Sequence, residues 1–411
     1  MKKYLFAALF GATSAAHADV PFATDIDRPF HEYTWLTAHN AFATTLVPNQ
    51  TLPIGRQLQL GVRGLMLDLH ESAGRVRLCH GACIGTEPTL ADTLNNEILP
   101  YVHSHVHAVV TLHLEDHISR DALADELSRA PEAMALSFNP DHWETDTWPT
   151  VRQMAEAGQK LVIFTQQYRN AGQLDTSAGQ ATLLFDQDYT AENYWSMGPL
   201  ATHDRTCRSR WDNLPLTLPG VSGRYAWPRL FVMNHFHDTP YGPHAWHDNR
   251  YDELRTRVDD HCLPAAGRKP NYIAVDFVEA GQAGSVIAAL NLGTIEFFDR
   301  EDGQGERLCA IHAGARRTVD LNEDELDRCP PYRVRSAVVR DVPAGTRVTL
   351  AERGKNASPA ITIEVRRDLH GERALIARFN QSQIDDHVTA VTVDGGPKGG
   401  VTHATFEPPA R

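Results

Sequence analysis

The sequence contains too few basic residues and too few long apolar segments for two broad classes of function. Lysine and arginine number 39, against 52 aspartates and glutamates, which gives a formal net charge of −13. A chain this acidic repels the phosphates of nucleic acids, so we expect no nucleic-acid partner. After residue 18, no uncharged segment approaches the roughly 20 apolar residues of a membrane-spanning helix.

Two short motifs are also missing. No two cysteines have C-x-x-C spacing, which argues against a cysteine-based zinc site. No glycine-rich phosphate-binding motif follows the first predicted strand, so a dinucleotide-binding sheet is not indicated.

The first residues have the layout of a secretory signal peptide. Lys2 and Lys3 precede an apolar stretch over residues 4–16, and an Ala-His-Ala cleavage site ends at residue 18. We predict a signal peptide over 1–18 and a mature chain, secreted or periplasmic in a bacterium. Loss of the two lysines changes the formal charge from −13 to −15.

Six cysteines remain in the predicted mature chain, and an even number in an exported protein favours disulfide bonds. Sequence alone does not fix the pairing. Neighbours along the chain are favoured, which gives Cys79–Cys83, Cys207–Cys262 and Cys309–Cys329. Free buried thiols are the alternative.

Strand-like and helix-like segments alternate over residues 19–292. Apolar runs predict strands at 61–71, 107–117, 160–166, 229–236 and 271–279. Helical patterns occur at 121–136, 148–158 and 281–293. Alternation of this kind implies a parallel sheet covered by helices. At this length a closed β/α barrel of the TIM type is favoured over a doubly wound sheet.

Residues 293–411 have a different texture. Short alternating segments are separated by Gly, Pro, Asn and Asp, which predicts a small all-β module, most simply a sandwich. The segment FFDREDGQG faintly resembles the aromatic-to-glycine hairpin of βγ-crystallin domains, so a βγ-crystallin-like module is the alternative.

Polar side chains occur near the carboxyl ends of four strand-like segments. His39 and Asn40 follow the first segment, Asp68 and Glu115 lie in the next two, and Asp276 is in the last. Side chains alternate along a strand, so each acid lies on the face opposite an apolar stripe. Alone, each residue has a structural reading as a core histidine, an ion-pair partner or a loop cap. Together they favour an active site, because barrel enzymes build theirs at this end.

The residue types suit general acid–base chemistry beside a hard cation. The first and last strands of a barrel are neighbours, so Asp276 can orient His39. His80 lies a short loop beyond Asp68, and two histidines across a pocket can serve as base and acid. Asn40, Asp68 and Glu115 supply oxygen ligands of the kind that Ca²⁺ or Mg²⁺ prefers.

Other residues are weaker candidates. Lys160 and Arg63 could contact substrate phosphate, although a solvent-facing lysine and an internal ion pair of Arg63 are the simpler readings. A Pro- and Gly-containing segment over 234–250 is either a second metal site, a substrate lid or an ordinary solvated loop. It carries His235, His237, His244 and His247.

In this order along the chain, the motifs TAHNAFA, QLQLGVRGLMLDLHE, RLCHGAC, VVTLHLEDH, TWPTVRQMAEAGQKLVIFTQ and NYIAVDF form a joint pattern. The pattern resembles the phosphatidylinositol-specific phospholipase C superfamily, in particular its X-domain-like phosphodiesterases. The resemblance covers about residues 30–292 and leaves out the β module. It implies a somewhat irregular β/α barrel that cleaves phosphodiesters.

The resemblance also assigns roles to individual residues. His39 and His80 correspond to the catalytic histidine pair, and Asp276 corresponds to a carboxylate that orients the first histidine. A further set corresponds to the Ca²⁺ ligands of metal-dependent members: Asn40, Asp68 and Glu115. Metal-independent bacterial members have an arginine in place of Asp68, so the acid here favours a metal-dependent route.

One position departs from the calcium-dependent pattern. Met66 stands where strongly calcium-dependent members carry an acid, and loss of one anionic ligand should weaken Ca²⁺ binding. His70 or Asp116 is considered as a partial substitute.

The expected activity is cleavage of a phosphodiester, with an inositol phospholipid as one candidate substrate, through a cyclic phosphate. Transient membrane contact and a monomeric state are expected with it. Two alternatives remain open at this point. One is direct attack by water, as in glycerophosphodiester hydrolysis, and the other is a catalytically inactive barrel that binds lipids, glycans or a surface partner.

Overall fold

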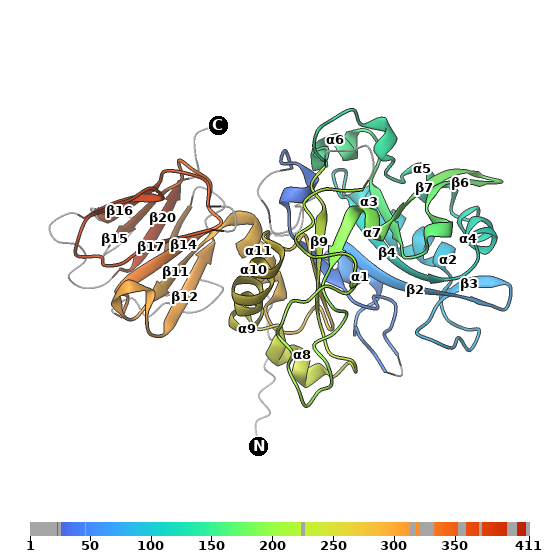
Figure 1. Cartoon of the computed structure of the whole chain (residues 1–411), viewed down its shortest axis with the longest axis horizontal. Helices are drawn as coiled ribbons and strands as arrows, with labels where there is room; N and C mark the ends of the chain where they lie inside the picture. The colour runs from blue at the N-terminus through green and yellow to red at the C-terminus, as the bar shows by residue number, and fades with distance from the viewer. Residues whose placement is uncertain are drawn as a thin grey trace, which may run out of the picture.

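The computed structural model describes residues 23, 26–45, 47–222, 227–312, 317–320, 333–351, 359–369, 372–392 and 401–407. The predicted signal peptide and Cys329 lie outside these residues. Within them, a curled, mainly parallel sheet with helices is followed by two antiparallel sheets (Figure 1). The predicted fold class, an α/β barrel of the TIM type with an all-β module after it, is confirmed.

Eight strands of the first sheet run parallel, and their order in space follows their order in the chain. They are β1 (Trp35–Ala38), β2 (Gly64–Ser72), β4 (Val110–His117), β5 (Leu161–Thr165), β7 (Gly179–Phe185), β8 (Thr190–Glu192), β9 (Leu230–His235) and β10 (Tyr272–Val275). The first strand pairs with β2 on one side and with β10 on the other, as in a barrel. Among the described residues no ladder joins β7 to β8, so the ring, which the sequence predicted to be closed, is open there.

Two further strands extend this sheet. The strands β3 (Arg75–Leu78) and β6 (Gly172–Thr176) are antiparallel additions to β2 and β7. Sequence analysis predicts β1, β2, β4, β5, β9 and β10 but misses β3 and the strands from Gly172 to Glu192. β6 and β8 contain few apolar residues, so the apolar-run criterion does not detect them, whereas β7 ends in the apolar run ATLLF, which this criterion could have detected.

Short helices lie between the strands, and most of them pack against the outer apolar face of the sheet. Their bounds are α1 (Ile54–Gln59), α2 (Leu90–Thr93), α3 (Leu99–Ser104), α4 (Arg120–Leu127), α5 (Pro131–Ala135), α6 (Val151–Glu156), α7 (Asp186–Tyr189), α8 (Gly242–Asp248), α9 (Tyr251–Thr256), α10 (Leu263–Ala266) and α11 (Ala283–Leu292). The segment predicted as one helix over 121–136 is two helices, because Pro131 begins α5 and Ala130 before it is not helical. No helix in the described part of the chain is long and apolar enough to cross a membrane.

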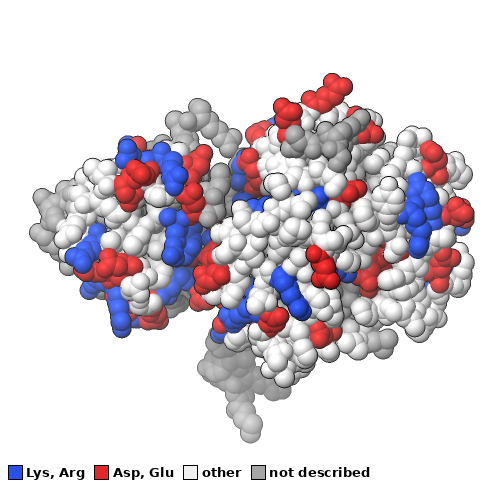
Figure 2. All heavy atoms as spheres, in the orientation of Figure 1, with Lys and Arg blue, Asp and Glu red and all other residues white. Residues whose placement is uncertain are grey.

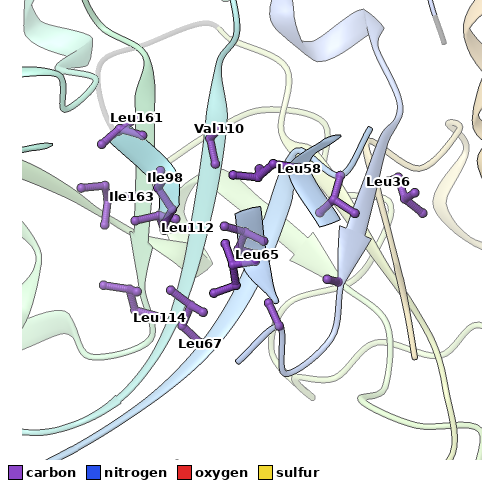
Figure 3. Close-up of a cluster of buried hydrophobic side chains, with 14 of the residues drawn as sticks. Leu36, Leu58, Leu65, Leu67, Ile98, Val110, Leu112, Leu114, Leu161 and Ile163 are labelled. Atoms are coloured by element: carbon purple, nitrogen blue, oxygen red, sulfur yellow. The ribbon is translucent and has the colours of Figure 1, made fainter. Parts of the chain in front are cut away.

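Apolar side chains fill the barrel wall on both sides. The outward residues of β2, including Leu65 and Leu67, pack with residues of β4 and β5 beneath the helices (Figure 3). Inside the barrel, an aromatic cluster that includes Trp35, Trp148 and Tyr272 fills the end where the strands begin. Because both of these regions are occupied by apolar groups, the carboxyl end is the part of the interior left to polar residues.

The chain after α11 forms two antiparallel sheets. One contains β12 (Arg307–His312), β11 (Thr294–Phe298), β14 (Ser336–Arg340) and β17 (Arg373–Ile376). The other contains β13 (Arg317–Asp320), β20 (His403–Glu407), β15 (Arg347–Ala351), β16 (Pro359–Val365), β19 (Val388–Thr392) and β18 (Gln383–Ile384). One buried cluster takes Phe297 and Val339 from the first sheet and Leu350 and Ile363 from the second, which makes a sandwich. The βγ-crystallin resemblance stays a prediction.

The sandwich lies beside α9, α10 and α11 (Figure 1). A buried ion pair crosses this boundary: Arg255 of α9 donates to Asp341 at 2.9 Å and also to Asp259 at 2.9 Å. Elsewhere, acidic and basic side chains are interspersed on the face of both parts that Figure 2 shows.

Gly64 is required by close packing between β1 and β2. A Cβ atom at this position would lie 2.3 Å from Thr37 Oγ1, and Thr37 is fully buried inside the barrel. We expect Gly64→Ala to lower the free energy of unfolding by about 1–3 kcal/mol, the usual cost of overpacking. Urea denaturation measures this change.

Gly242→Ala is the control, because a Cβ atom there meets nothing within 4 Å. In the Gly64→Ala background, Thr37→Ala should recover part of the loss. Equal stability of Gly64→Ala and the parent protein would show that the two strands are not in close contact.

Candidate active site

The carboxyl ends of the barrel strands surround one cleft of about 1060 Å³. Its lining includes five residues selected from the sequence: His39, Asn40, Asp68, His80 and Glu115. These residues are widely separated along the chain and are brought together by the parallel order of β1, β2 and β4. The remaining member of the predicted set, Asp276, contacts His39 directly.

His39 is held in a defined orientation by Asp276. The two residues directly follow the paired strands β1 and β10, and the Nδ1 atom of His39 lies 2.8 Å from Oδ1 of Asp276. The Asp276 carboxylate is 5% exposed and the imidazole is 17% exposed. We assign the Nδ1 proton to the hydrogen bond with Asp276, which leaves the lone pair on Nε2.

Side chains around this pair fix it further. Asn49 donates to the same Asp276 oxygen at 2.9 Å, and Gln50 donates to the backbone carbonyls of His39 and Val275. The ring of Phe236 stacks on the His39 ring, with centroids 3.5 Å apart and planes within 4°. His39 can therefore rotate little without breaking several contacts.

His80 forms a second histidine–carboxylate pair. Its Nδ1 atom lies 2.9 Å from Oδ2 of Asp68, and its side chain is 75% exposed, whereas that of Asp68 is 9% exposed. The Asn40 amide nitrogen also lies 3.3 Å from this Nδ1, but a protonated Nδ1 can only donate, so we assign the bond to Asp68. The hydrogen bond from His80 to Asp68 raises the pKa of His80 above its usual value, and the charges of Asp68 and Glu115 add to this effect.

The loop that carries His80 is closed by the predicted disulfide Cys79–Cys83. The backbone amide of Cys79 donates to the carbonyl of Asp68 at 3.2 Å, which fixes the start of the loop at β2. The predicted Cys207–Cys262 disulfide is also present. Cys309 is disulfide-bonded, but its predicted partner Cys329 lies outside the described residues.

Three oxygen-bearing side chains of the cleft fit a hard cation. Asp68 and Glu115 are paired in register on the neighbouring strands β2 and β4, and Asn40 follows the adjacent strand β1. Glu115 also accepts from His117 at 3.0 Å. Carboxylate and amide oxygens on adjoining strand ends are the donor set that Ca²⁺ takes in proteins.

The floor of the cleft beneath these oxygens is less polar. Met66 and His113 lie side by side in the β2–β4 register, and His113 stacks on Phe164. Burial lowers the pKa of His113 to about 3, so this imidazole is neutral near pH 7. A methionine here adds no anionic ligand to the cation site.

Neither residue considered as a substitute for the missing acid at position 66 reaches the cleft. Asp116 is buried on the other face of β4, where it accepts from Thr165 at 2.7 Å and Asn170 at 2.6 Å. His70 stacks on His117 beyond the cleft lining. Alternation along the strand sends Asp116 to the face opposite Glu115.

The cleft does not include Arg63 or Lys160, the two residues considered for contact with substrate phosphate. Arg63 precedes β2 and is buried, where it donates to the carbonyls of Leu58 and Val62. Lys160 precedes β5 and donates to the carbonyl of Val102. Both residues stand where strands begin, and the cleft is at the end where strands finish.

Among the charged cleft residues that escaped the sequence analysis are Arg210, Glu192 and Asp186. Arg210 donates to Glu192 at 2.9 Å and lies 3.9 Å from Glu115. Although burial alone would lower the pKa of Arg210, the surrounding carboxylates raise it, so its guanidinium stays charged. Asp186 also lines the cleft, and burial together with the charge of Glu192 raises its pKa to about 7.

Only one of these three residues leaves a signal in the sequence. Asp186 follows the apolar run ATLLF, so the strand-end criterion that selected Asp68 would also have selected it. Glu192 ends a strand of three residues. Arg210 lies between β8 and β9 in a long segment whose described residues form no helix or longer strand. Neither segment has a periodicity that the sequence reveals.

The sequence matches a known family model over this region. Residues 26–214 match the model described as PI-PLC X. The match confirms the resemblance to phosphatidylinositol-specific phospholipase C that the motifs indicate. It includes His39, Asn40, Asp68, His80 and Glu115 but ends before Asp276.

Curated relatives carry little functional description. A PI-PLC X domain-containing protein of Arabidopsis thaliana is 27% identical over 319 residues, which cover 70% of this chain and 66% of that protein. An uncharacterized protein of Mycobacterium tuberculosis is 30% identical over 144 residues, 28% of this chain and 29% of that one. The chain therefore spans less than two thirds of the length of these relatives.

Solved structures of similar chains are phospholipases. Phosphatidylinositol-specific phospholipase C from Listeria monocytogenes is 13% identical, with a TM-score of 0.45 over 68% of this chain and 99% of that one. A calcium-dependent phosphoinositol-specific phospholipase C from a Gram-negative Pseudomonas species is 16% identical, with a TM-score of 0.33 over 66% and 97%. Similarity at these TM-scores assigns neither substrate nor mechanism to the present chain.

The raised pKa of His80 depends on its partner Asp68. We expect Asp68→Asn to lower the pKa of His80, because the variant loses both the ionic hydrogen bond and the negative charge. The parent imidazole keeps its proton to a higher pH than the variant does. Titration of the histidine ring signals by NMR measures the shift.

Glu71→Gln is the control, because Glu71 is an exposed acid of the same strand that contacts Ser119 and not His80. This control should leave the His80 titration unchanged. An unchanged pKa of His80 in Asp68→Asn would mean that the pair does not form in solution.

Proposed function

We propose that this chain, whose residues 26–214 match the PI-PLC X family, is a phosphodiesterase that works by general acid–base catalysis. The observation that carries the proposal is the placement of two histidine–carboxylate pairs around one cleft: His39 with Asp276, and His80 with Asp68. The two histidines have different environments, and each environment suits one role.

His39 is the proposed general base. With its Nδ1 proton bound to Asp276, the Nε2 lone pair can take a proton from a substrate hydroxyl next to the phosphodiester. The hydroxyl oxygen then forms a new bond to phosphorus, and a cyclic phosphate results. Asp276 stabilises the imidazolium that forms, as a buried carboxylate does for a catalytic histidine.

His80 is the proposed general acid. The bond from phosphorus to the leaving alcohol breaks as the new bond forms, and His80 gives its proton to the leaving oxygen. When no cation is bound at Asp68, the hydrogen bond to Asp68 raises the pKa of His80 and keeps it protonated further toward neutral pH than an ordinary histidine. Its exposed position at the mouth of the cleft leaves the ring accessible to the leaving group.

A cation is proposed at Asn40, Asp68 and Glu115, with Ca²⁺ favoured and Mg²⁺ as the alternative. When bound, it would neutralise charge on the phosphate and lower the pKa of the attacking hydroxyl. Arg210, 3.9 Å from Glu115, is a permanent cation on the same side of the cleft and can contribute to phosphate binding without a metal.

An inositol phospholipid is the proposed substrate class, and the rim of the cleft supports an amphiphile. Charged groups lie at the strand ends, whereas three rim residues present apolar side chains to solvent: Val47 at 64%, Ile84 at 75% and Trp195 at 39% exposure. Such a rim suits transient contact with a lipid surface, while the polar interior takes the head group. The two disulfides support work in an oxidising compartment, so we propose a secreted or periplasmic protein.

We expect His39→Ala and His80→Ala each to lower kcat by about 10²–10⁴-fold, the usual contribution of a proton-transfer residue. Phosphatidylinositol in mixed micelles is the assay substrate, and ³¹P NMR identifies the product. The parent enzyme should release an inositol cyclic phosphate.

His103→Ala is the control, because His103 is exposed and pairs with Glu132 outside the cleft. It should keep parental activity. Turnover without a cyclic phosphate would instead indicate attack by water. No turnover by the parent protein of this lipid or of glycerophosphoinositol would refute the enzyme and favour a binding role.

Met66 provides a test of the cation site that does not need activity. We expect Met66→Glu to bind Ca²⁺ about tenfold more tightly than the parent, because added anionic ligands raise the affinity of oxygen sites. Met66→Gln matches the size without the charge and should show no such gain. Isothermal titration calorimetry measures both, and equal affinities of the Glu and Gln variants would place the cation elsewhere.

A further inference from the structure

A second cluster of potential metal ligands lies outside the proposed catalytic set. Its members are His203, His237, His244 and Asp248, and one donor atom from each lies within 4.8 Å of the others. Three of the four occur in the histidine-rich segment 234–250 noticed in the sequence, and Asp248 is the last residue of α8. The fourth is His203, from the long connection between β8 and β9.

The shortest distances already approach those of a metal site. His237 Nε2 lies 3.2 Å from Asp248 Oδ2, and His203 Nε2 lies 3.1 Å from Asp248 Oδ1. Ligands of a tetrahedral zinc with bonds of about 2.0–2.1 Å are roughly 3.3 Å apart. The two distances to Asp248 match this spacing, and the widest separation in the set, up to 4.8 Å, would contract by about 1.5 Å on binding one ion.

The orientation of His237 favours a ligand role. Its Nδ1 lies 2.9 Å from the carbonyl of Gly198, so Nδ1 carries the proton and the Nε2 lone pair points at the cluster. A backbone carbonyl on the second ring nitrogen is the usual outer partner of a metal-bound histidine. Only 5% of His237 is exposed, so this orientation is fixed by its surroundings.

The surroundings of the cluster contain a small cavity and an imidazole nitrogen that makes no hydrogen bond. The Nδ1 atom of His244 is buried and has no hydrogen-bond partner among the described residues. A cavity of about 10 Å³, the space of roughly one water molecule, is lined by His237, His244 and Asp248. An ion coordinated in this space would satisfy His244 and the buried Asp248 carboxylate together.

We propose that His203, His237, His244 and Asp248 bind one transition-metal ion, with Zn²⁺ as the best match. Three imidazoles and one carboxylate favour zinc over Ca²⁺ or Mg²⁺, which prefer oxygen ligands. Four protein ligands make a closed, structural site. The site is separate from the cation proposed at Asn40, Asp68 and Glu115, and it does not depend on phosphodiesterase activity.

The structural consequence concerns the rim of the cleft. The ion would join the β8–β9 connection, the start of the loop after β9, and α8. Phe236, which stacks on His39, immediately precedes the ligand His237, and the next residues, Asp238 and Thr239, line the cleft. Metal binding would therefore hold Phe236 against His39 and fix this part of the rim.

The test uses the full chain, treated with chelator and dialysed, and then titrated with Zn²⁺ by calorimetry. We expect one tight equivalent, and a rise in Tm with Zn²⁺ that Ca²⁺ does not produce. His203→Ala and His244→Ala should each lower the Zn²⁺ affinity by about 100-fold or more, beyond the loss caused by removing an outer partner. His203 is exposed, so its variant should fold even if the others do not.

Two controls separate this site from its neighbours. Asp68→Asn should bind Zn²⁺ like the parent, because Asp68 belongs to the other cation site. Trp246→Ala should also retain it, because Trp246 is exposed on the same helix and outside the ligand set. Absence of tight Zn²⁺ binding, retention in both His203→Ala and His244→Ala, or equal loss in either control would overturn the proposal.

Discussion

The pairing of β1 with β10 is the constraint on which the candidate site depends. Ala38 and Val275 are partners in this parallel ladder, so the residues that follow them, His39 and Asp276, stand next to each other. They are 237 positions apart in the sequence. The amide of His39 donates to the Val275 carbonyl, which carries the pairing one residue beyond the strand. Closure of the barrel at this seam is thus what creates the oriented imidazole.

The cost of burying charge determines how the other carboxylates of the cleft are paired. A buried carboxylate without a partner is costly, and each one here has a partner. Asp276 accepts from His39 and Asn49, Asp68 accepts from His80, and Glu192 accepts from Arg210. The apolar clusters on the outer and lower faces of the strands confine these groups to one end. The same distribution that stabilises the barrel therefore gathers the groups that can perform acid–base chemistry.

The connections after β3, β8 and β9 supply the cleft residues that do not lie at strand ends. A disulfide closes the loop that presents His80, and a second one anchors the connection that carries His203 and Arg210. Phe236 reaches back from the end of β9 to the ring of His39. The cleft thus combines a rigid floor of strand residues with a rim built from covalently or sterically restrained loops.

Local sequence patterns are enough to predict the barrel, the sandwich after it, and the strand-end residues His39, Asp68, Glu115 and Asp276. Alternation along a strand and the apolar runs that flank these residues are local properties, so they can be read without coordinates. Three features become visible only in the tertiary structure. Arg210 lines the cleft, Arg63 and Lys160 lie at the opposite ends of the strands, and His203 contacts Asp248. The first and third features depend on the path of an irregular connection, and the second depends on the end of the strand at which a residue lies. No local sequence pattern determines these positions.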